Sequence, residues 1–62
     1  MSKLKIMREQ KLMTQAELSE KSGVNLRMIQ YYEQGAKDIK KGNVMTVLSI
    51  AEVLGCSIKD II

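Results

Sequence analysis

The sequence predicts an all-α domain of five short helices. Three observations predict it: the chain is only 62 residues long, it contains no proline, and its four glycines separate stretches in which apolar residues recur at helical spacing. A chain of this length forms one small domain, which we expect to span residues 1–62. One cysteine and no histidine leave neither an internal disulfide nor a metal site to stabilise it. Packed helices, or a second copy of the chain, must supply the stability.

Polar capping residues predict the first two helices. Ser2 is a suitable N-cap for a first helix that ends at Leu12 or Met13. Residues 14–17, Thr-Gln-Ala-Glu, fit a capping box, in which the threonine hydroxyl and the glutamate carboxylate each accept a hydrogen bond from a backbone amide at the helix start. The second helix is therefore expected from about Gln15 to Ser22, before a glycine that can end it.

The next two helices are bounded in the same way. Asn25 is expected to cap a third helix, from about Leu26 to Gln34. The fourth helix ends at residue 55, a glycine, and its start has two interpretations. Asn43 caps it directly, or Asp38 caps an earlier start that places a glycine inside the helix at a cost of about 1 kcal/mol. The sequence leaves this choice open.

A short fifth helix is expected after Ser57, with three isoleucines on one side: Ile58, Ile61 and Ile62. The last two either complete the core or remain exposed, in which case a second copy of the chain would cover them.

Residues 15–34 have the spacing of a helix-turn-helix, two helices that cross at about 90–120° through a short turn. Gly23 makes the turn, and Ser19 is small where the second helix passes over the first. Apolar side chains close the wedge between the helices: Leu18, Val24, Ile29 and Tyr32. All these requirements are met together, which is a stronger signal than any one of them.

The predicted third helix has one hydrogen-bonding arc. With Leu26 at zero on a helical wheel, the arc comprises Gln30, Gln34, Arg27 and Tyr31 at about 40°, 80°, 100° and 140°. The opposite arc is mostly apolar. Arginine can form two hydrogen bonds with guanine, glutamine with adenine, and leucine can contact a thymine methyl, so this arc suits the major groove of DNA. The wheel by itself fits an ordinary amphipathic helix with a polar outer face somewhat better than a DNA-reading helix.

Four segments of the sequence together resemble one known family: residues 13–18, 22–24, 29–35 and 54–58, which read MTQAEL, SGV, IQYYEQG and LGCSI. They resemble the phage-repressor and Cro-like helix-turn-helix family, also called the xenobiotic-response-element (XRE) family. The resemblance extends from about Leu4 to Ile62. It implies a five-helix lambda-repressor-like domain that binds double-stranded DNA operators as a homodimer, with its third helix in the major groove.

The resemblance also implies roles for individual residues by matching position. Gln15 would contact a backbone phosphate and the nearby base edge, and Gln34 would donate to a phosphate. The residues that would face bases are Asn25, Leu26, Arg27 and Tyr31. Gln30 is included in this site only because of its position on the helical wheel, and the family resemblance does not assign it a role. Arg8 and Glu33 would form a partly buried ion pair between the first and third helices, with a structural role.

The sequence departs from the family pattern at several places. Leu12 stands where a turn-forming glycine is common, and Ser22 stands where an apolar residue is usual. The interval from Gly35 to Gly55 is longer than in the commonest family pattern. If the loop in this interval folds toward the groove edge, it brings Lys37, Lys40 and Lys41 close to DNA phosphates, and we include Lys37 and Lys40 in the predicted site.

Net charge, the lengths of apolar runs and the absence of catalytic motifs exclude several classes of function. The net charge is +3, which suits nucleic acid but is also common on solvated surfaces. No run of apolar residues exceeds two, so no membrane span is expected, and the first residues lack the apolar block of a secretory signal, so we expect a cytoplasmic protein. No cofactor motif, metal-ligand cluster or nucleophile–base pair is present, so we expect neither an enzyme nor a small-molecule substrate.

The hypothesis from sequence is a sequence-specific, repressor-type DNA-binding regulator that acts as a homodimer on a pseudo-palindrome. An alternative is a protein-interaction module, an antitoxin or adaptor, that uses the same fold. A third reading is that the chain is the DNA-binding part of a longer regulator.

Overall fold

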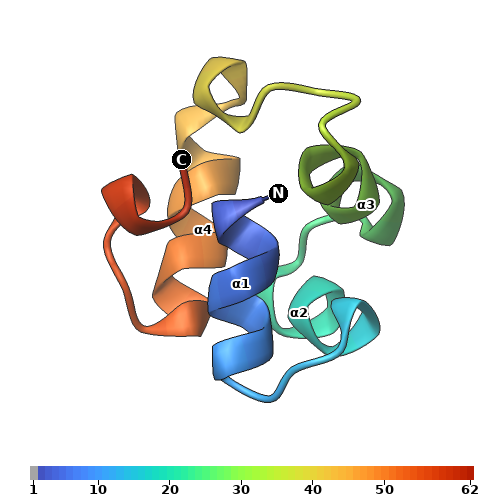
Figure 1. Ribbon diagram of the computed structural model, residues 1–62, viewed down its shortest axis with the longest axis vertical. Coiled ribbons are helices and arrows are strands. Elements are labelled where there is room, and N and C mark those ends of the chain that lie inside the picture. The colour runs from blue at the N-terminus through green and yellow to red at the C-terminus, as the bar shows by residue number, and fades with distance from the viewer. Residues whose placement is uncertain (1) are drawn as a thin grey trace.

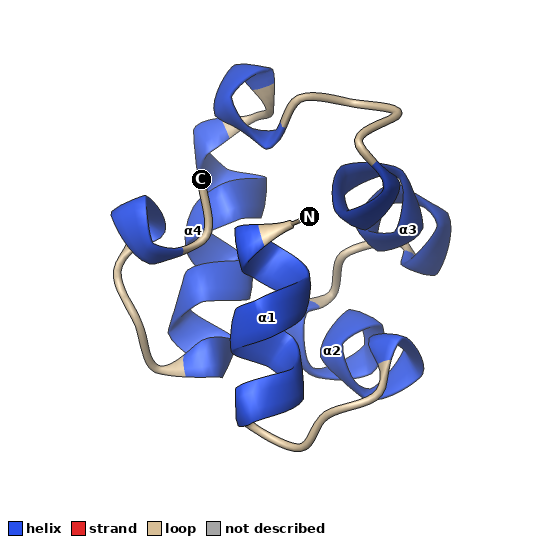
Figure 2. Ribbon diagram, in the orientation of Figure 1, coloured by secondary structure: helices blue, strands red, loops and turns tan. Residues whose placement is uncertain are grey.

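A computed structural model describes residues 2–62, and this part of the chain contains four α-helices and two 3-10 turns (Figures 1 and 2). In order they are α1 (Lys3–Gln10), α2 (Gln15–Ser22), α3 (Leu26–Gln34), η1 (Ile39–Lys41), α4 (Val44–Leu54) and η2 (Ile58–Asp60). No strand occurs in the described residues, and the all-α prediction is confirmed. Met1, which the predicted domain includes, lies outside them.

Each α-helix begins where a polar side chain accepts a hydrogen bond from the first turn. The Ser2 hydroxyl caps α1, and Asn25 and Asn43 cap α3 and α4. At α2, Thr14 Oγ1 accepts from the Glu17 amide at 3.0 Å, and Glu17 Oε1 accepts from the Thr14 amide at 3.0 Å. These bonds satisfy amides that have no partner inside the helix. The predicted capping box and the predicted bounds of α2 and α3 are confirmed.

The end of α1 is the boundary that the sequence prediction has wrong. The helix ends at Gln10 rather than at Leu12 or Met13. Leu12 adopts a left-handed conformation with φ +57°, and the Met13 amide donates back to the Arg8 carbonyl at 3.2 Å. This reversal is the one a glycine usually makes, and it stops α1 even though a leucine stands there.

The start of α4 is settled in favour of Asn43, whose Oδ1 accepts from the Met45 amide at 2.8 Å. Asp38 instead caps η1, where its Oδ1 accepts from the Lys40 amide at 2.9 Å. Gly42 lies between the two elements with an ordinary φ of −74°. The basic segment therefore forms a separate 3-10 turn and does not extend α4.

The predicted fifth helix is a single 3-10 turn, η2. The Asp60 carboxylate accepts from both the Ser57 amide (3.0 Å) and the Ser57 hydroxyl (2.9 Å), and the Ile61 amide donates to the Ile58 carbonyl at the short i+3 spacing. Ile61 is buried in the core, whereas Ile62 remains 37% exposed. One of the two terminal isoleucines thus completes the core and the other does not.

The core joins all four α-helices and η2. Its buried apolar side chains are Leu4, Leu18, Ile29, Tyr32, Val47, Ile50, Ala51, Leu54 and Ile61. Helix α2 packs against α3 and α4, and α1 packs against α3 and η2. Within the predicted wedge, the Ser19 hydroxyl donates to the Val24 carbonyl at 2.6 Å and so joins α2 to the turn. This packing leaves α3 on the opposite side of the molecule from η2 (Figure 1).

None of the helices within residues 2–62 is both long enough and apolar enough to cross a membrane.

We expect Leu12→Gly to raise the free energy of unfolding by about 0.5–1 kcal/mol, because a left-handed backbone is strained for leucine and the greater entropy of unfolded glycine offsets only part of the relief. The Leu12 side chain is 90% exposed, so little burial is lost. Urea unfolding followed by circular dichroism measures the change. Lys11→Gly is the matched control, since Lys11 has φ −89° and glycine there should lower stability. A lower stability for Leu12→Gly would contradict the assigned strain.

Candidate nucleic-acid interface

The outward face of α3 carries the arc predicted from the sequence. Arg27 and Gln34 are exposed, and Gln30 and Tyr31 are half-buried. On the opposite side of the helix Ile29 and Tyr32 are buried in the core. Leu26, at the start of the helix, is 38% exposed. The packing of α3 therefore presents hydrogen-bonding side chains outward from a helix that is fixed on its other side.

Asn25 sits at the start of α3 and uses only part of its hydrogen-bonding capacity for capping. Its Oδ1 accepts from the Arg27 amide at 2.8 Å. The side-chain nitrogen of an asparagine is a donor of two hydrogens, and these are not needed for the cap. Asn25 is exposed, so the amide group can donate to a phosphate or a base edge beside the N-terminus of α3.

A buried ion pair fixes α3 to α1. Arg8 Nε donates to Glu33 Oε2 at 2.7 Å and Arg8 Nη2 donates to Glu33 Oε1 at 3.1 Å, and the two side chains are 10% and 3% exposed. The third guanidinium nitrogen donates to the Met13 carbonyl at 2.6 Å. The hydrogen bond to Glu33 raises the pKa of Arg8 above its already high ordinary value. This pair is the one that the family resemblance implies.

Gln15 joins this pair from the start of α2. Its Nε2 donates to Glu33 Oε1 at 3.0 Å, and the Gln15 residue is half-buried. On the helical wheel Glu33 lies at about 340°, between Leu26 and the apolar side, and so at one edge of the polar arc. The bond therefore places Gln15 beside that edge of the predicted site.

Lys37 lies at the other edge of the arc. Its Nζ is 5.6 Å from the centre of the Tyr31 ring, a distance at which the positive charge is attracted to the aromatic face. Tyr31 lies at about 140° on the wheel. The structure thus attaches Gln15 to one edge of the α3 arc and Lys37 to the other.

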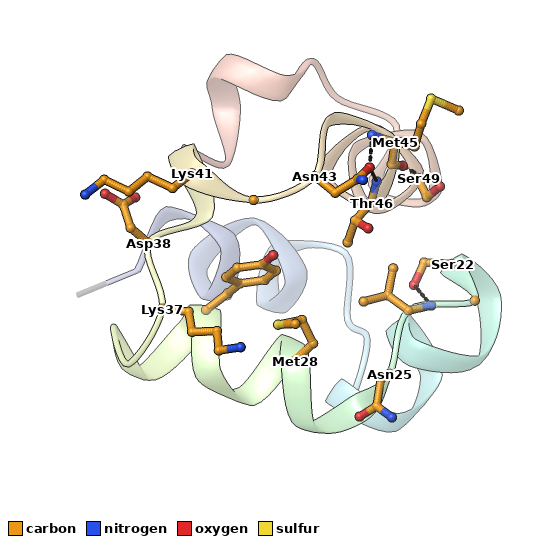
Figure 3. Close-up of a pocket in the computed structure, with 14 residues that line it drawn as sticks. Ser22, Asn25, Met28, Lys37, Asp38, Lys41, Asn43, Met45, Thr46 and Ser49 are labelled. Atoms are coloured by element: carbon orange, nitrogen blue, oxygen red, sulfur yellow. Dashed lines mark hydrogen bonds between the residues drawn. The ribbon is translucent and has the colours of Figure 1, made fainter.

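A groove of about 720 Å³ runs between α3 and the start of α4 (Figure 3). Lys37 and Met28 lie on one side of it, and Asn43 and Thr46 lie on the other. Lys41 also lines the groove, together with one acidic residue, Asp38. The two lysines outweigh the single carboxylate, so the groove adjoining the arc is weakly positive.

The structure does not bring Lys40 to this groove. Lys40 instead lines a small hollow of about 90 Å³ whose other walls include Val44, Ile58 and Ile62. The loop passes through η1, so neighbouring lysines point to different sides of it. Lys41, which the sequence analysis considered but left out of the site, lines the groove beside α3. The phosphate role of Lys40 stays a prediction.

Asn43 and Thr46 were not predicted as site residues. Their place in the groove depends on the path of residues 36–43, which fold against Tyr32 and not along α4. The only feature of the sequence that bears on this path is the glycine at position 42. The reason for a glycine there, its close approach to the Tyr32 ring, appears only in the folded structure. A Cβ at Gly42 would lie 2.6 Å from Tyr32 Oη and 3.2 Å from the Ile39 carbonyl oxygen.

Cys56 is half-buried against the core, and burial raises the pKa of its thiol. Within residues 2–62 no group of three or more His, Cys, Asp and Glu side chains is placed to hold a metal ion.

We expect Gly42→Ala to lower the free energy of unfolding by about 1–3 kcal/mol, the usual cost of overpacking. The backbone of Gly42 is ordinary, so the clash with the Tyr32 hydroxyl carries most of the effect. Tyr32→Phe removes that oxygen, and Gly42→Ala should therefore cost less in the Tyr32→Phe background. Thermal unfolding of the two single variants and the double variant measures this coupling. Equal losses in both backgrounds would show that the hydroxyl does not restrict position 42.

A family model described as Helix-turn-helix matches residues 4–61, nearly the whole chain. No curated protein sequence matches the chain.

Proposed function

The chain belongs to the helix-turn-helix family of Cro- and repressor-like (XRE) DNA-binding regulators, and from this membership we propose a sequence-specific repressor that binds a pseudo-palindromic operator as a homodimer in the cytoplasm. The observation that carries the proposal is the exposed polar arc of α3, held outward by Ile29 and Tyr32 in the core. A helix with such an arc fits the major groove, which is wide enough to admit one α-helix.

The proposed readout divides the arc by chemistry. Arg27 suits guanine, because a guanidinium can donate to both O6 and N7 of that base. Gln30 and Tyr31 offer shorter polar contacts to neighbouring base edges, and Leu26 offers an apolar contact to a thymine methyl. Asn25 donates from the N-terminus of α3, next to the base that Leu26 reaches.

The proposed phosphate contacts flank this readout. Gln15 and Gln34 donate to the DNA backbone on either side of the major groove, and Lys37 and Lys40 supply positive charge beyond the C-terminal end of α3. Each lysine that neutralises a phosphate releases counterions, so affinity should fall steeply as salt concentration rises. Such contacts fix the register of the protein on the duplex and carry no sequence information.

We expect Arg27→Ala to weaken binding to the preferred duplex by about 1–3 kcal/mol more than it weakens binding to random DNA. Lys37→Ala is the control: it should weaken both duplexes alike and reduce the slope of log affinity against log salt by about 1. Fluorescence anisotropy with labelled duplexes, repeated at several salt concentrations, measures both quantities. Equal losses on the two duplexes for Arg27→Ala would remove Arg27 from base readout.

The preferred duplex comes from selection of binding sites in a random oligonucleotide pool. A pseudo-palindrome with half-sites about one helical turn apart would support the proposed dimer. The absence of binding to any duplex at low salt would favour the alternative, a protein-interaction module with the same fold.

The proposed dimer uses an apolar patch outside the α3 arc, near the start of α4 and η2. Val44 is 68% exposed, and Leu48 and Ile62 are 36% and 37% exposed. Val44 and Ile62 border the small hollow between η1, α4 and η2. The molecule measures 25 × 22 × 20 Å, whereas half-sites lie about 34 Å apart. Both α3 arcs must face the same duplex, so the two copies must be joined side by side with neither arc turned away from the DNA.

We expect Val44→Glu to shift the protein toward monomer, because it places a charge in an apolar contact. Met45→Glu is a closely matched control, since Met45 is the next residue, is also 68% exposed, and lines the groove beside α3. Sedimentation equilibrium over a range of concentrations, with and without the selected duplex, measures the association. An equal effect of the two variants, or a monomeric wild-type protein both free and on DNA, would contradict this dimer.

A further inference from the structure

The side chain of Gln15 is anchored by a carboxylate on another helix. Gln15 is the first residue of α2 and Glu33 lies near the end of α3, yet Gln15 Nε2 donates to Glu33 Oε1 at 3.0 Å. The carboxylate is itself held by two hydrogen bonds from Arg8, at 2.7 and 3.1 Å. Gln15 is thus attached to a group that has no freedom to move.

The chemistry of the carboxylate also fixes which way the Gln15 amide faces. An ionised carboxylate only accepts hydrogen bonds, so the amide must turn its nitrogen toward Glu33. The second N–H hydrogen and the carbonyl oxygen of Gln15 then remain for a ligand. The Glu33 side chain is 3% exposed, so water has little access to compete for the bond.

The ion pair does not need this bond for its own stability. Both carboxylate oxygens of Glu33 already accept from Arg8, and in the described residues no buried side-chain nitrogen or oxygen lacks a partner. The Gln15 bond is an addition to a complete pair. Its consequence is to restrict a glutamine side chain that would otherwise rotate freely at the start of a helix.

We propose that Glu33 is a positioning residue for DNA binding, which holds the Gln15 amide ready to donate its second hydrogen to a backbone phosphate. This inference rests on the proposed function. A side chain that is already ordered loses less conformational freedom on binding, and releasing it should weaken affinity about two- to tenfold. Glu33 acts through Gln15 and does not itself touch DNA.

A double-mutant cycle tests the proposal with the full chain and the selected duplex. Glu33→Gln removes the charge and leaves a single acceptor oxygen, for which the donors of Arg8 and Gln15 compete, and Gln15→Ala removes the anchored group. We expect Glu33→Gln to weaken binding about two- to tenfold when Gln15 is present and to have almost no further effect when Gln15→Ala is also present. Circular dichroism fixes a temperature at which every variant is folded.

Arg8→Lys is the control for an indirect effect through the fold. It keeps a positive charge beside Glu33 and both carboxylate oxygens as acceptors for Gln15, but loses the two-pronged contact, so it should lower the unfolding temperature and weaken DNA binding less than Glu33→Gln does. The unfolding temperature of each variant separates stability from affinity.

A second measurement needs only the wild-type protein and remains available if Glu33→Gln fails to fold. Nitrogen-15 relaxation of the Gln15 side-chain amide reports its motion, and the exposed Gln34 side-chain amide serves as the mobile reference. We expect the Gln15 amide to be markedly more ordered than that of Gln34. An equally mobile Gln15 amide would overturn the positioning role.

The outcomes distinguish this inference from the function on which it rests. Wild-type protein that binds no duplex overturns the proposed function and the DNA role of Glu33 together. Wild-type protein that binds the duplex, but loses the same affinity through Glu33→Gln with and without Gln15, overturns the positioning role alone.

Discussion

The hydrogen-bonded pair between Arg8 and Glu33 is the constraint on which the arrangement of the helices depends. A chain of 62 residues buries only about 60% of its unfolded surface and is marginally stable, so an unpaired buried charge would cost a large share of its stability. Two charges removed from water are costly unless they meet in one good geometry. Arg8 meets Glu33 with two nitrogens and the Met13 carbonyl with a third, so one guanidinium holds α1, the turn after it and α3 together.

This pair sets the rotation of α3 about its own axis. A shift of one residue in a helix turns its face by about 100°, which would carry Glu33 away from Arg8 and leave both charges unpaired. The same rotation would bring polar side chains into the core in place of Ile29 and Tyr32. The core and the ion pair therefore demand the same orientation, and that orientation exposes Arg27 and Gln34. Which side chains face outward follows from what must face inward.

Signals confined to a few neighbouring residues predicted much of this architecture. The capping box at Thr14 and the glycines after α2 and α3 predict the bounds of those helices, because a cap depends only on residues within one turn of the helix end. The predicted end of α1 is wrong because Leu12 adopts the left-handed backbone conformation that sequence patterns assign to glycine. Local signals do not predict the groove beside α3, because its walls come from separate helices. They do not predict the bond from Gln15 to Glu33 either, because these residues are 18 positions apart and meet only in the complete fold. The predicted DNA contacts stay predictions.

The surface around α3 combines fixed edges with a freer centre. Gln15 is held by Glu33 at one edge, and Lys37 lies over the Tyr31 ring at the other. Between them Arg27 is exposed, as a long side chain needs to be if it is to find a base edge. Phosphate contacts at the edges would fix the register of the protein on the duplex, and base contacts between them would read its sequence. The ion pair between α1 and α3 thus also holds one edge of the proposed contact surface, through Gln15.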